Sequence, residues 1–304
     1  MMRSSQGLSV VHETRYGYVP AVDMGHHIAC LRPLSDAGQQ LLDYRLDIHP
    51  EPSRHSTLRD AFGNSRTYFA LHTEHAELLV RASSVVQVFH RYAELNPDQG
   101  PSCGAVRTRL AYRRGASFEA ASEFSHASPF VPLLPALRDY AAPLLPDERP
   151  LVAAVMDLMY RIATDFSYAT ASTDISTPLA TVFEQRRGVC QDFAHLMIAC
   201  LRACGLAARY VSGYLLTRPP PGCAPLLGAD ASHAWLSVWC PGLNEAENWL
   251  DLDPTNNCIP ALQHVRVAQG RDFGDVTPLR GVIRGGARHT LTVRVTTREV
   301  DGAV

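Results

Sequence analysis

The sequence has no apolar run of about 18 residues, the length that a membrane-spanning helix needs. Its N-terminal stretch, MMRSSQGLSVVHETRYGY, lacks the apolar core of a secretory signal peptide. It also has no long basic run, and a formal net charge of −2 gives no electrostatic support for binding nucleic acid. We therefore expect a cytoplasmic protein that has neither nucleic acid nor a membrane as its partner.

No pair of cysteines has the CxxC spacing of a zinc ribbon or a thioredoxin-like motif. Without an export signal, we expect most of the cysteines to be reduced. Cys200 and Cys204 lie four residues apart on a predicted helix, where they could flank a metal, although two core thiols are the simpler interpretation. We predict no metal and no cofactor. The eight cysteines are Cys30, Cys103, Cys190, Cys200, Cys204, Cys223, Cys240 and Cys258.

Residues 1–95 are predicted to form an N-terminal β-sandwich-like domain, because apolar and polar residues alternate with period two. The stretch FGNSR within this region is typical of a turn. Residues 96–150, rich in proline, are predicted to be a connecting region with one short helix near 134–144. The predicted β region shows no catalytic cluster, and its adjacent His26 and His27 are interpreted as surface residues.

From residue 151 the spacing of apolar residues becomes helical. Three helices are predicted, then three strands, and then one more alternating strand near the C-terminus; helices followed by an antiparallel sheet make an α+β domain over 151–304. The helical segments are LVAAVMDLMYRIATDF, TPLATVFEQRR and CQDFAHLMIACLRAC, and the strand segments are AARYVSGYLLT, HAWLSVWCPG, ENWLDLDPT and GGARHTLTVRVTTREV.

Cys190 stands at the first turn of the third predicted helix, just after Gly188. The unpaired N–H groups of a helix N-terminus carry partial positive charge, which favours the reactive thiolate. The same groups can donate hydrogen bonds to an oxyanion that forms on an attacked carbonyl. Cys190 is therefore a candidate nucleophile, although a buried structural cysteine is the alternative that a lone thiol would favour.

A thiol nucleophile needs a base, and the base needs a group that orients it. His233 opens a predicted strand 43 residues after Cys190, and Asp253 follows 20 residues later at the end of the next strand. Neighbouring antiparallel strands can place such a pair side by side. Asp251 shares a strand face with Asp253, so spacing alone leaves both possible. His195, on the same helix as Cys190, is a weaker rival base.

Three segments resemble the transglutaminase-like family of papain-type cysteine enzymes, in particular a bacterial branch with its own N-terminal β domain. They are RRGVCQDFAHLMIACLRACGLAARYVSGYL, DASHAWLSVWCPGL and NWLDLDPTN. The resemblance implies a papain/transglutaminase-like core in which Cys190 is the nucleophile, His233 the base and Asp253 its orienting carboxylate.

The resemblance also implies roles for residues around this triad. Tyr168, upstream of the cysteine helix, is a candidate oxyanion donor, and Gln191 and Trp235 are candidates for the oxyanion site or the pocket. Independently of the resemblance, the proline-rich loop at 218–232 runs directly into His233, and this position predicts a rim or lid over the cleft. Ser237 stands where family members often carry an acidic residue, and no acidic calcium-binding loop is present.

The sequence thus predicts an enzyme that attacks carboxamide or peptide carbonyls of a protein or peptide substrate through a thioester. Transglutaminase-like acyl transfer and amide hydrolysis both remain open. A cysteine protease on the same fold is one alternative, and a catalytically inactive binding module is another. A metal site is the weakest alternative, because Cys190, His233 and Asp253 are one ligand short of a closed tetrahedral shell.

Overall fold

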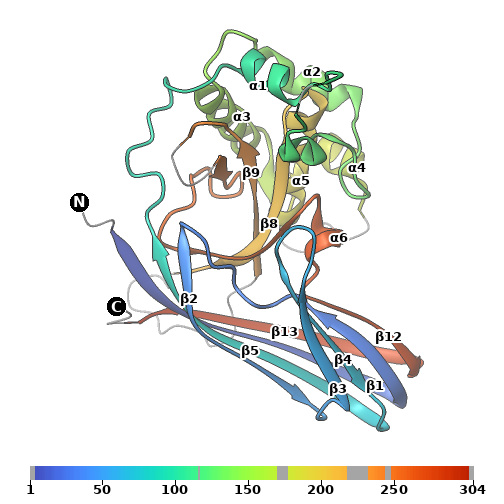
Figure 1. The fold of residues 1–304 in the computed structure, drawn as a ribbon. Coiled ribbons are helices and arrows are strands. Elements are labelled where there is room, and N and C mark those ends of the chain that lie inside the picture. Colours follow the sequence, from blue (N-terminus) through green and yellow to red (C-terminus); the bar gives the residue numbers. More distant parts are fainter. Residues whose placement is uncertain (1–3, 116, 170–176, 218–231, 244–247, 301–304) are drawn as a thin grey trace.

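A computed structural model describes residues 4–300 of the chain, except for 116, 170–176, 218–231 and 244–247. Strands from both ends of the chain form one long sheet, and the middle of the chain forms a mixed α/β core that lies against it (Figure 1). The predicted α+β class with an N-terminal all-β region is confirmed. None of the helices in the described part of the chain is long and apolar enough to cross a membrane.

The N-terminal sheet is antiparallel and is built around one 25-residue strand, β1. The first half of β1 pairs with β5 on one edge, and its last residues pair with β4. The strand order is β2-β5-β1-β4-β3, and two further strands pair with β1. The bounds are β1 Ser5–Ala29, β2 Gln39–His49, β3 Arg54–Arg59, β4 Ser65–Leu71, β5 His75–Phe89, β12 Leu279–Gly285 and β13 Arg288–Glu299.

The C-terminal strand does not lie where the sequence placed it. The predicted strand over 288–299 exists as β13, but it pairs with residues 8–19 of β1 and not with the catalytic core, and β12 pairs with residues 22–29. In Figure 1 these two red strands lie among the blue ones. The physical reason is hydrogen bonding: without β12 and β13, one edge of the longest strand would keep its N–H and C=O groups unpaired.

The core domain consists of helices packed on a four-stranded antiparallel sheet of order β10-β9-β8-β11. A short parallel pair, β6 with β7, lies just before the central helix. The helices are α1 Cys103–Leu110, α2 Pro135–Ala141, α3 Leu151–Asp165, α4 Leu179–Gln185, α5 Cys190–Ala203 and α6 Phe273–Val276, with 3-10 turns η1 Ala120–Ser125 and η2 Ala142–Leu144. The strands are β6 Ser167–Tyr168, β7 Arg187–Gly188, β8 Ala208–Leu215, β9 Ser232–Trp239, β10 Trp249–Leu252 and β11 His264–Gly270.

The region 96–150 is part of this core and is more than a connection. The helix expected near 134–144 is present as α2 and η2, but α1 and η1 were not predicted. Both are short, and α1 buries only two of its side chains, Cys103 and Val106. Helices this short depend on tertiary packing for their stability, so their sequences carry a weak periodic signal.

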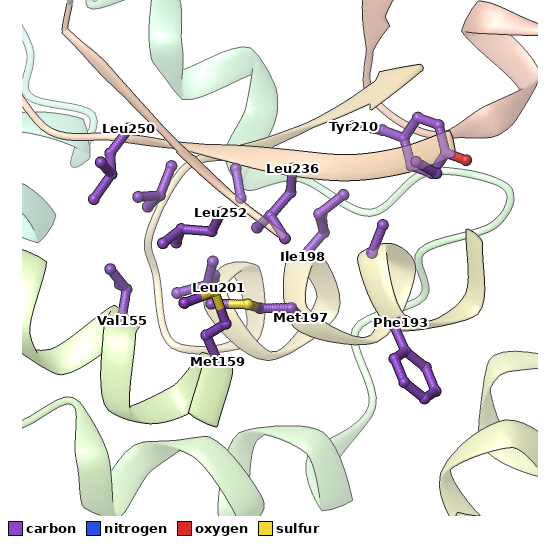
Figure 2. Close-up of a cluster of buried hydrophobic side chains, with 14 of the residues drawn as sticks. Val155, Met159, Phe193, Met197, Ile198, Leu201, Tyr210, Leu236, Leu250 and Leu252 are labelled. Carbon is purple, nitrogen blue, oxygen red and sulfur yellow. The ribbon is translucent and has the colours of Figure 1, made fainter. Parts of the chain in front are cut away.

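Helix α5 is the centre of the core and is apolar on almost every side. In Figure 2 its Met197, Ile198 and Leu201 lie among side chains from α3 and from the sheet, whereas Phe193 points away from the sheet. All of residues 192–202 are buried. Each large apolar side chain buried in this way contributes about 1.5–3 kcal/mol. This packing fixes the helix, and therefore fixes the position of the residue at its first turn.

The N-terminal sheet contacts the core at β11, along the edge that no strand of the core sheet pairs with. The side-chain amide of Gln39 donates to the carbonyl of Arg266 (2.8 Å) and accepts from its N–H (2.8 Å). The amide of Asn64 does the same with Gln269, at 2.7 and 2.8 Å. These two side chains replace a neighbouring strand, so an edge that would otherwise be open is paired by the N-terminal domain.

Candidate active site

Cys190 is the first residue of α5 and is half-buried. The first bond of the helical ladder joins the Phe193 N–H to the Val189 carbonyl (3.1 Å), so the N–H of Cys190 precedes that ladder. The N–H of Val189 donates to the carboxylate of Asp192 (2.8 Å). Gly188 makes this possible, since a Cβ at that position would lie 2.8 Å from Asp192. The absent side chain therefore permits close packing of the turn that presents the thiol.

His233 lies near the start of β9, opposite Gly213 of β8, on a strand that packs against α5. Its ring lies close enough to the Cys190 side chain for a hydrogen bond between them to contribute to raising the pKa of the imidazole. Its Nε2 lies 2.7 Å from Oδ2 of Asp253, so Nδ1 is the ring nitrogen left for the sulfur. The structure therefore brings together all three residues of the predicted triad, from the start of a helix, the start of one strand and the end of the next.

Asp253 follows the last residue of β10 and is fully buried. Its Oδ1 accepts from the backbone N–H groups of Thr255 (3.0 Å) and Asn256 (3.2 Å). Its Oδ2 accepts from the Asn256 side-chain amide (2.7 Å) as well as contacting His233. These donors hold the carboxylate in one orientation and stabilise its charge.

Hydrogen bonds and electrostatic interactions within the site shift the pKa values of His233 and Asp253 in opposite directions. Burial alone lowers the pKa of His233, but hydrogen bonding and electrostatic interaction with Asp253 and Cys190 outweigh burial and raise it to about 10. Burial likewise raises the pKa of Asp253, and hydrogen bonds from His233 and His264 reverse this, so that its pKa lies well below the usual range. His233 is therefore an imidazolium and Asp253 a carboxylate at neutral pH.

Asp251 and Asp253 have different surroundings in the structure, a difference that their spacing in the sequence does not reveal. Asp251 is fully buried on β10, where its carboxylate forms an ion pair with Arg91 and lies 3.8 Å from a nitrogen of Arg266. It also accepts a hydrogen bond from the Ser237 hydroxyl (2.5 Å). Ser237, the position that departs from the family pattern, therefore supports this buried ion cluster. Asp251 therefore belongs to the structure of the core.

Two residues of the site were missed by reasoning from the sequence: His264 and Asn256. The Nε2 atom of His264 lies 3.1 Å from Oδ2 of Asp253, and the Asn256 amide lies 3.4 Å from Nε2 of His233. Asn256 stands three residues after Asp253, in the turn that the DPT motif already indicates. No local signal marks His264, because β11 itself was not predicted.

The three further candidates have different surroundings. Tyr168 is 53% exposed and lies beside the cysteine turn through the β6–β7 pair. Burial raises the pKa of Tyr168, and its electrostatic interaction with Cys190 adds to the rise. Gln191 is half-buried and lines a cavity of about 330 Å³ beside the first turn of α5. Trp235, expected to line the pocket, is completely buried against His233 and His264, with ring centroids 5.9 and 5.3 Å apart.

His195, the rival base, is buried in an aromatic stack with Phe130 and Tyr210. Its Nε2 accepts a hydrogen bond from the Phe273 N–H (3.2 Å), and burial lowers its pKa to about 4. It is therefore a neutral residue of the core. The expected rim at 218–232, and Cys223 with it, lies outside the described residues except for Ser232.

Of the described residues, His233, Asp253 and His264 form a cluster whose ligand atoms lie within 4.8 Å of one another. The three do not fit a metal ion, because both imidazole nitrogens point at one carboxylate oxygen at hydrogen-bond distances of 2.7 and 3.1 Å. Ligands around a zinc ion lie about 2.0–2.2 Å from the metal and surround it tetrahedrally. The contacts here are those of a hydrogen-bonded network.

Comparisons with known proteins identify the families that two parts of the chain match. The model of the bacterial transglutaminase-like N-terminal region matches residues 8–87, and that of the transglutaminase-like superfamily matches residues 138–254, a range that includes Cys190, His233 and Asp253. An uncharacterized protein of Mycobacterium tuberculosis is 43% identical over 275 residues, which cover 90% of this chain and 86% of that protein.

Two further relatives bear on the fold and on the chemistry. The solved structure of a candidate cysteine protease from Cytophaga hutchinsonii has a TM-score of 0.73 and 19% identity, and the match covers 99% of this chain and 93% of that one, so the two share a fold. A protein-glutamine gamma-glutamyltransferase of Pseudomonas aeruginosa is 36% identical over 90 residues, 29% of this chain and 12% of that protein.

Proposed function

This chain belongs to the transglutaminase-like superfamily, and from that premise we propose that it is a thiol enzyme that attacks carboxamide or peptide carbonyls. Cys190 is the nucleophile, His233 the acid and base, and Asp253 the carboxylate that orients His233. The observation that carries the proposal is the continuous set of contacts from the Cys190 side chain through the imidazole to the buried carboxylate.

In the first half-reaction the sulfur of Cys190 forms a bond to the carbonyl carbon, and the carbonyl electrons move to the oxygen. The imidazolium of His233 then gives its proton to the leaving amine as the C–N bond breaks, which leaves a thioester and a neutral imidazole. The high pKa of His233 supports this assignment, since a proton is present on the ring at neutral pH. Asp253 stabilises that protonated state.

We propose two hydrogen-bond donors for the oxyanion of this step. One is the backbone N–H of Cys190, which precedes the helical ladder at the positive end of α5. The other is the hydroxyl of Tyr168, whose strand pairs with the turn before the cysteine. Gln191, on the next position of the helix, lines the neighbouring cavity and is proposed to contact substrate there.

The second half-reaction releases the acyl group. Neutral His233 removes a proton from water or from an amine, which attacks the thioester carbon. The C–S bond then breaks, which releases the acyl group and regenerates the thiolate of Cys190 beside the imidazolium. Acyl transfer to an amine is supported by the partial match to a glutamyltransferase, although that match covers only 29% of this chain. Incubation with glutamine-containing peptides and a labelled primary amine tests the two outcomes, because a transferase incorporates the label whereas a hydrolase or protease only releases acid.

The thiol itself can be tested without a known substrate. Iodoacetamide at near-neutral pH is expected to label Cys190 first, because burial raises the pKa of the other six described cysteines. Cys190→Ala should abolish the fast labelling measured by mass spectrometry, and His233→Ala should slow it. Cys204→Ala, at the other end of the same helix, is the matched control and should leave it unchanged.

The labelling result can contradict the proposal in two ways. Faster labelling of Cys103 or Cys223 than of Cys190 in the wild-type protein would show that Cys190 is not the activated thiol. An unchanged rate in His233→Ala would show that the imidazole does not support it. A chain in which no cysteine reacts would favour the inactive binding module.

A further inference from the structure

The carboxylate of Asp253 contacts two imidazoles through the same oxygen. The Nε2 atom of His233 lies 2.7 Å from Oδ2, and that of His264 lies 3.1 Å from it. We propose that His264 is a positioning residue, which acts through Asp253 to hold the His233 imidazolium in its productive orientation. This inference rests on the proposed function of Cys190 and His233.

The fold brings His264 to this place from a distant part of the sheet. Asp253 follows β10 on one edge of the core sheet, and His264 begins β11 on the opposite edge, with β9 and β8 between them. The segment from 253 to 264 therefore crosses the end of the sheet. It begins with a tight turn, in which Asp253 and Cys258 exchange backbone hydrogen bonds of 2.9 and 3.1 Å.

The surroundings of His264 determine which nitrogen carries the proton. The ring is buried, and its Nδ1 has no hydrogen-bond partner among the described residues. A proton on Nδ1 would therefore be a buried donor without an acceptor, which is unfavourable. A proton on Nε2 instead points at the Asp253 carboxylate. His264 is thus a hydrogen-bond donor to Asp253, as His233 is from the other side.

Neighbouring groups keep this ring in place. Trp235 packs edge-on against His264, with ring centroids 5.3 Å apart, and its six-membered ring lies over Gly213. A Cβ at position 213 would come within 2.5 Å of the Trp235 ring. The N-terminal domain fixes β11 itself through Gln39 and Asn64. The β domain therefore supports the strand that carries the second histidine.

The hydrogen bonds of Asp253 explain why an additional donor matters. The turn supplies two backbone N–H groups to Oδ1, and Oδ2 faces the two imidazoles and the Asn256 amide. Without His264, one side of Oδ2 loses its donor, and the carboxylate can rotate away from His233. Removing the outer hydrogen-bond partners of metal-bound histidines typically lowers metal affinity or activity by about 10- to 100-fold, and we expect an effect at the lower end of that range for this hydrogen-bonded pair.

The experiment measures the rate at which iodoacetamide labels Cys190 at pH 7 in the full-length protein. His264→Ala should lower this rate by about tenfold. His264→Gln should restore most of it, because the glutamine amide can place its donor where Nε2 was, whereas the shorter His264→Asn cannot. His75→Ala, which removes another buried histidine from the N-terminal sheet, is the matched control for a loss of packing and should leave the rate unchanged.

A double-mutant cycle separates positioning from a purely structural role. If His264 acts through Asp253, then His264→Ala should cause no further loss in an Asp253→Asn background. A full tenfold loss in that background would overturn the inference, as would equal rates for His264→Gln and His264→Asn. The Gln and Asn comparison serves the same purpose if the alanine variant does not fold.

The test also distinguishes this inference from the proposed function. If Cys190 is the fastest thiol and His233→Ala slows its labelling, the proposed function holds whatever the His264 variants do. Unchanged labelling in His264→Ala would then contradict the positioning role alone. Slow labelling of Cys190 in the wild-type protein would contradict the proposed function itself.

Discussion

Replacing Asp251 with asparagine should destabilise the fold and leave the reactivity of Cys190 unchanged. The side chain of Asp251 is completely buried, and its charge is balanced by Arg91, whose side chain is 9% exposed, and by Arg266 at 3.8 Å. Asparagine keeps the shape of the side chain and removes its charge. The two guanidinium groups then lose this carboxylate while remaining buried, which is the costly way to break an ion pair.

The expected loss of unfolding free energy follows from the pKa of Asp251 and from the usual cost of breaking a buried ion pair. Burial raises the pKa of Asp251, but Arg91, Arg266 and the Ser237 hydroxyl outweigh it and lower the pKa from 3.8 to about 2. That change corresponds to about 2 kcal/mol of stabilisation of the carboxylate by the fold, present above pH 3.8 and lost as the pH falls toward 2. Removing one partner of a buried pair typically costs about 3–5 kcal/mol. We therefore expect a loss of about 2–5 kcal/mol.

The assay is urea unfolding of the wild type and the variant at pH 7, together with iodoacetamide labelling of Cys190 in the folded proteins. Asp253→Asn is the matched control, with the same chemical change two residues away, and should slow the labelling. If Asp251→Asn slowed labelling as much as Asp253→Asn does, or unfolded at the same urea concentration as the wild type, the separation of their roles would be refuted.

Two further predictions concern the domain contact and the pH dependence of stability. Asn64→Ala removes both amide contacts to the β11 backbone at Gln269 and should lower the free energy of unfolding by about 2 kcal/mol or more, because a buried N–H and C=O lose their partners. An unchanged free energy of unfolding in urea would show that the Asn64 contacts do not hold β11. The folded-state pKa of His233 is raised from 6.5 to about 10, so the stability that its charge contributes is present in full below pH 6.5 and is lost as the pH rises through about 10. The pKa of Asp253 is lowered from 3.8, so its contribution is present above that value and is lost in acid. The difference in unfolding free energy between the wild type and His233→Gln should therefore be largest between pH 3.8 and 6.5 and should shrink toward pH 10, and a difference that grew with pH would have the wrong sign.

The local pattern of apolar and polar residues was sufficient to predict the helix and the strand that carry the proposed nucleophile and base. The apolar run that follows Cys190, and Gly205 after its end, predicted the helix observed at Cys190–Ala203, where Gly205 has a φ of +77°. Alternation predicted β8, β9 and β10. The ends of such elements are marked by residues next to one another in the chain, and so a single sequence contains the information. The resemblance to a family then selected Cys190, His233 and Asp253.

What the sequence determined by itself was therefore the helix and strands that carry Cys190, His233 and Asp253, and which residue types stand at their ends. Only the tertiary structure decided between Asp251 and Asp253, placed β12 and β13 on β1, and brought His264 to the Asp253 carboxylate. The reason is that periodicity specifies how the faces of an element differ but does not specify its partner. Partners are chosen by long-range pairing, by burial of charge beside a counter-charge, and by the crossing of a segment over the end of a sheet.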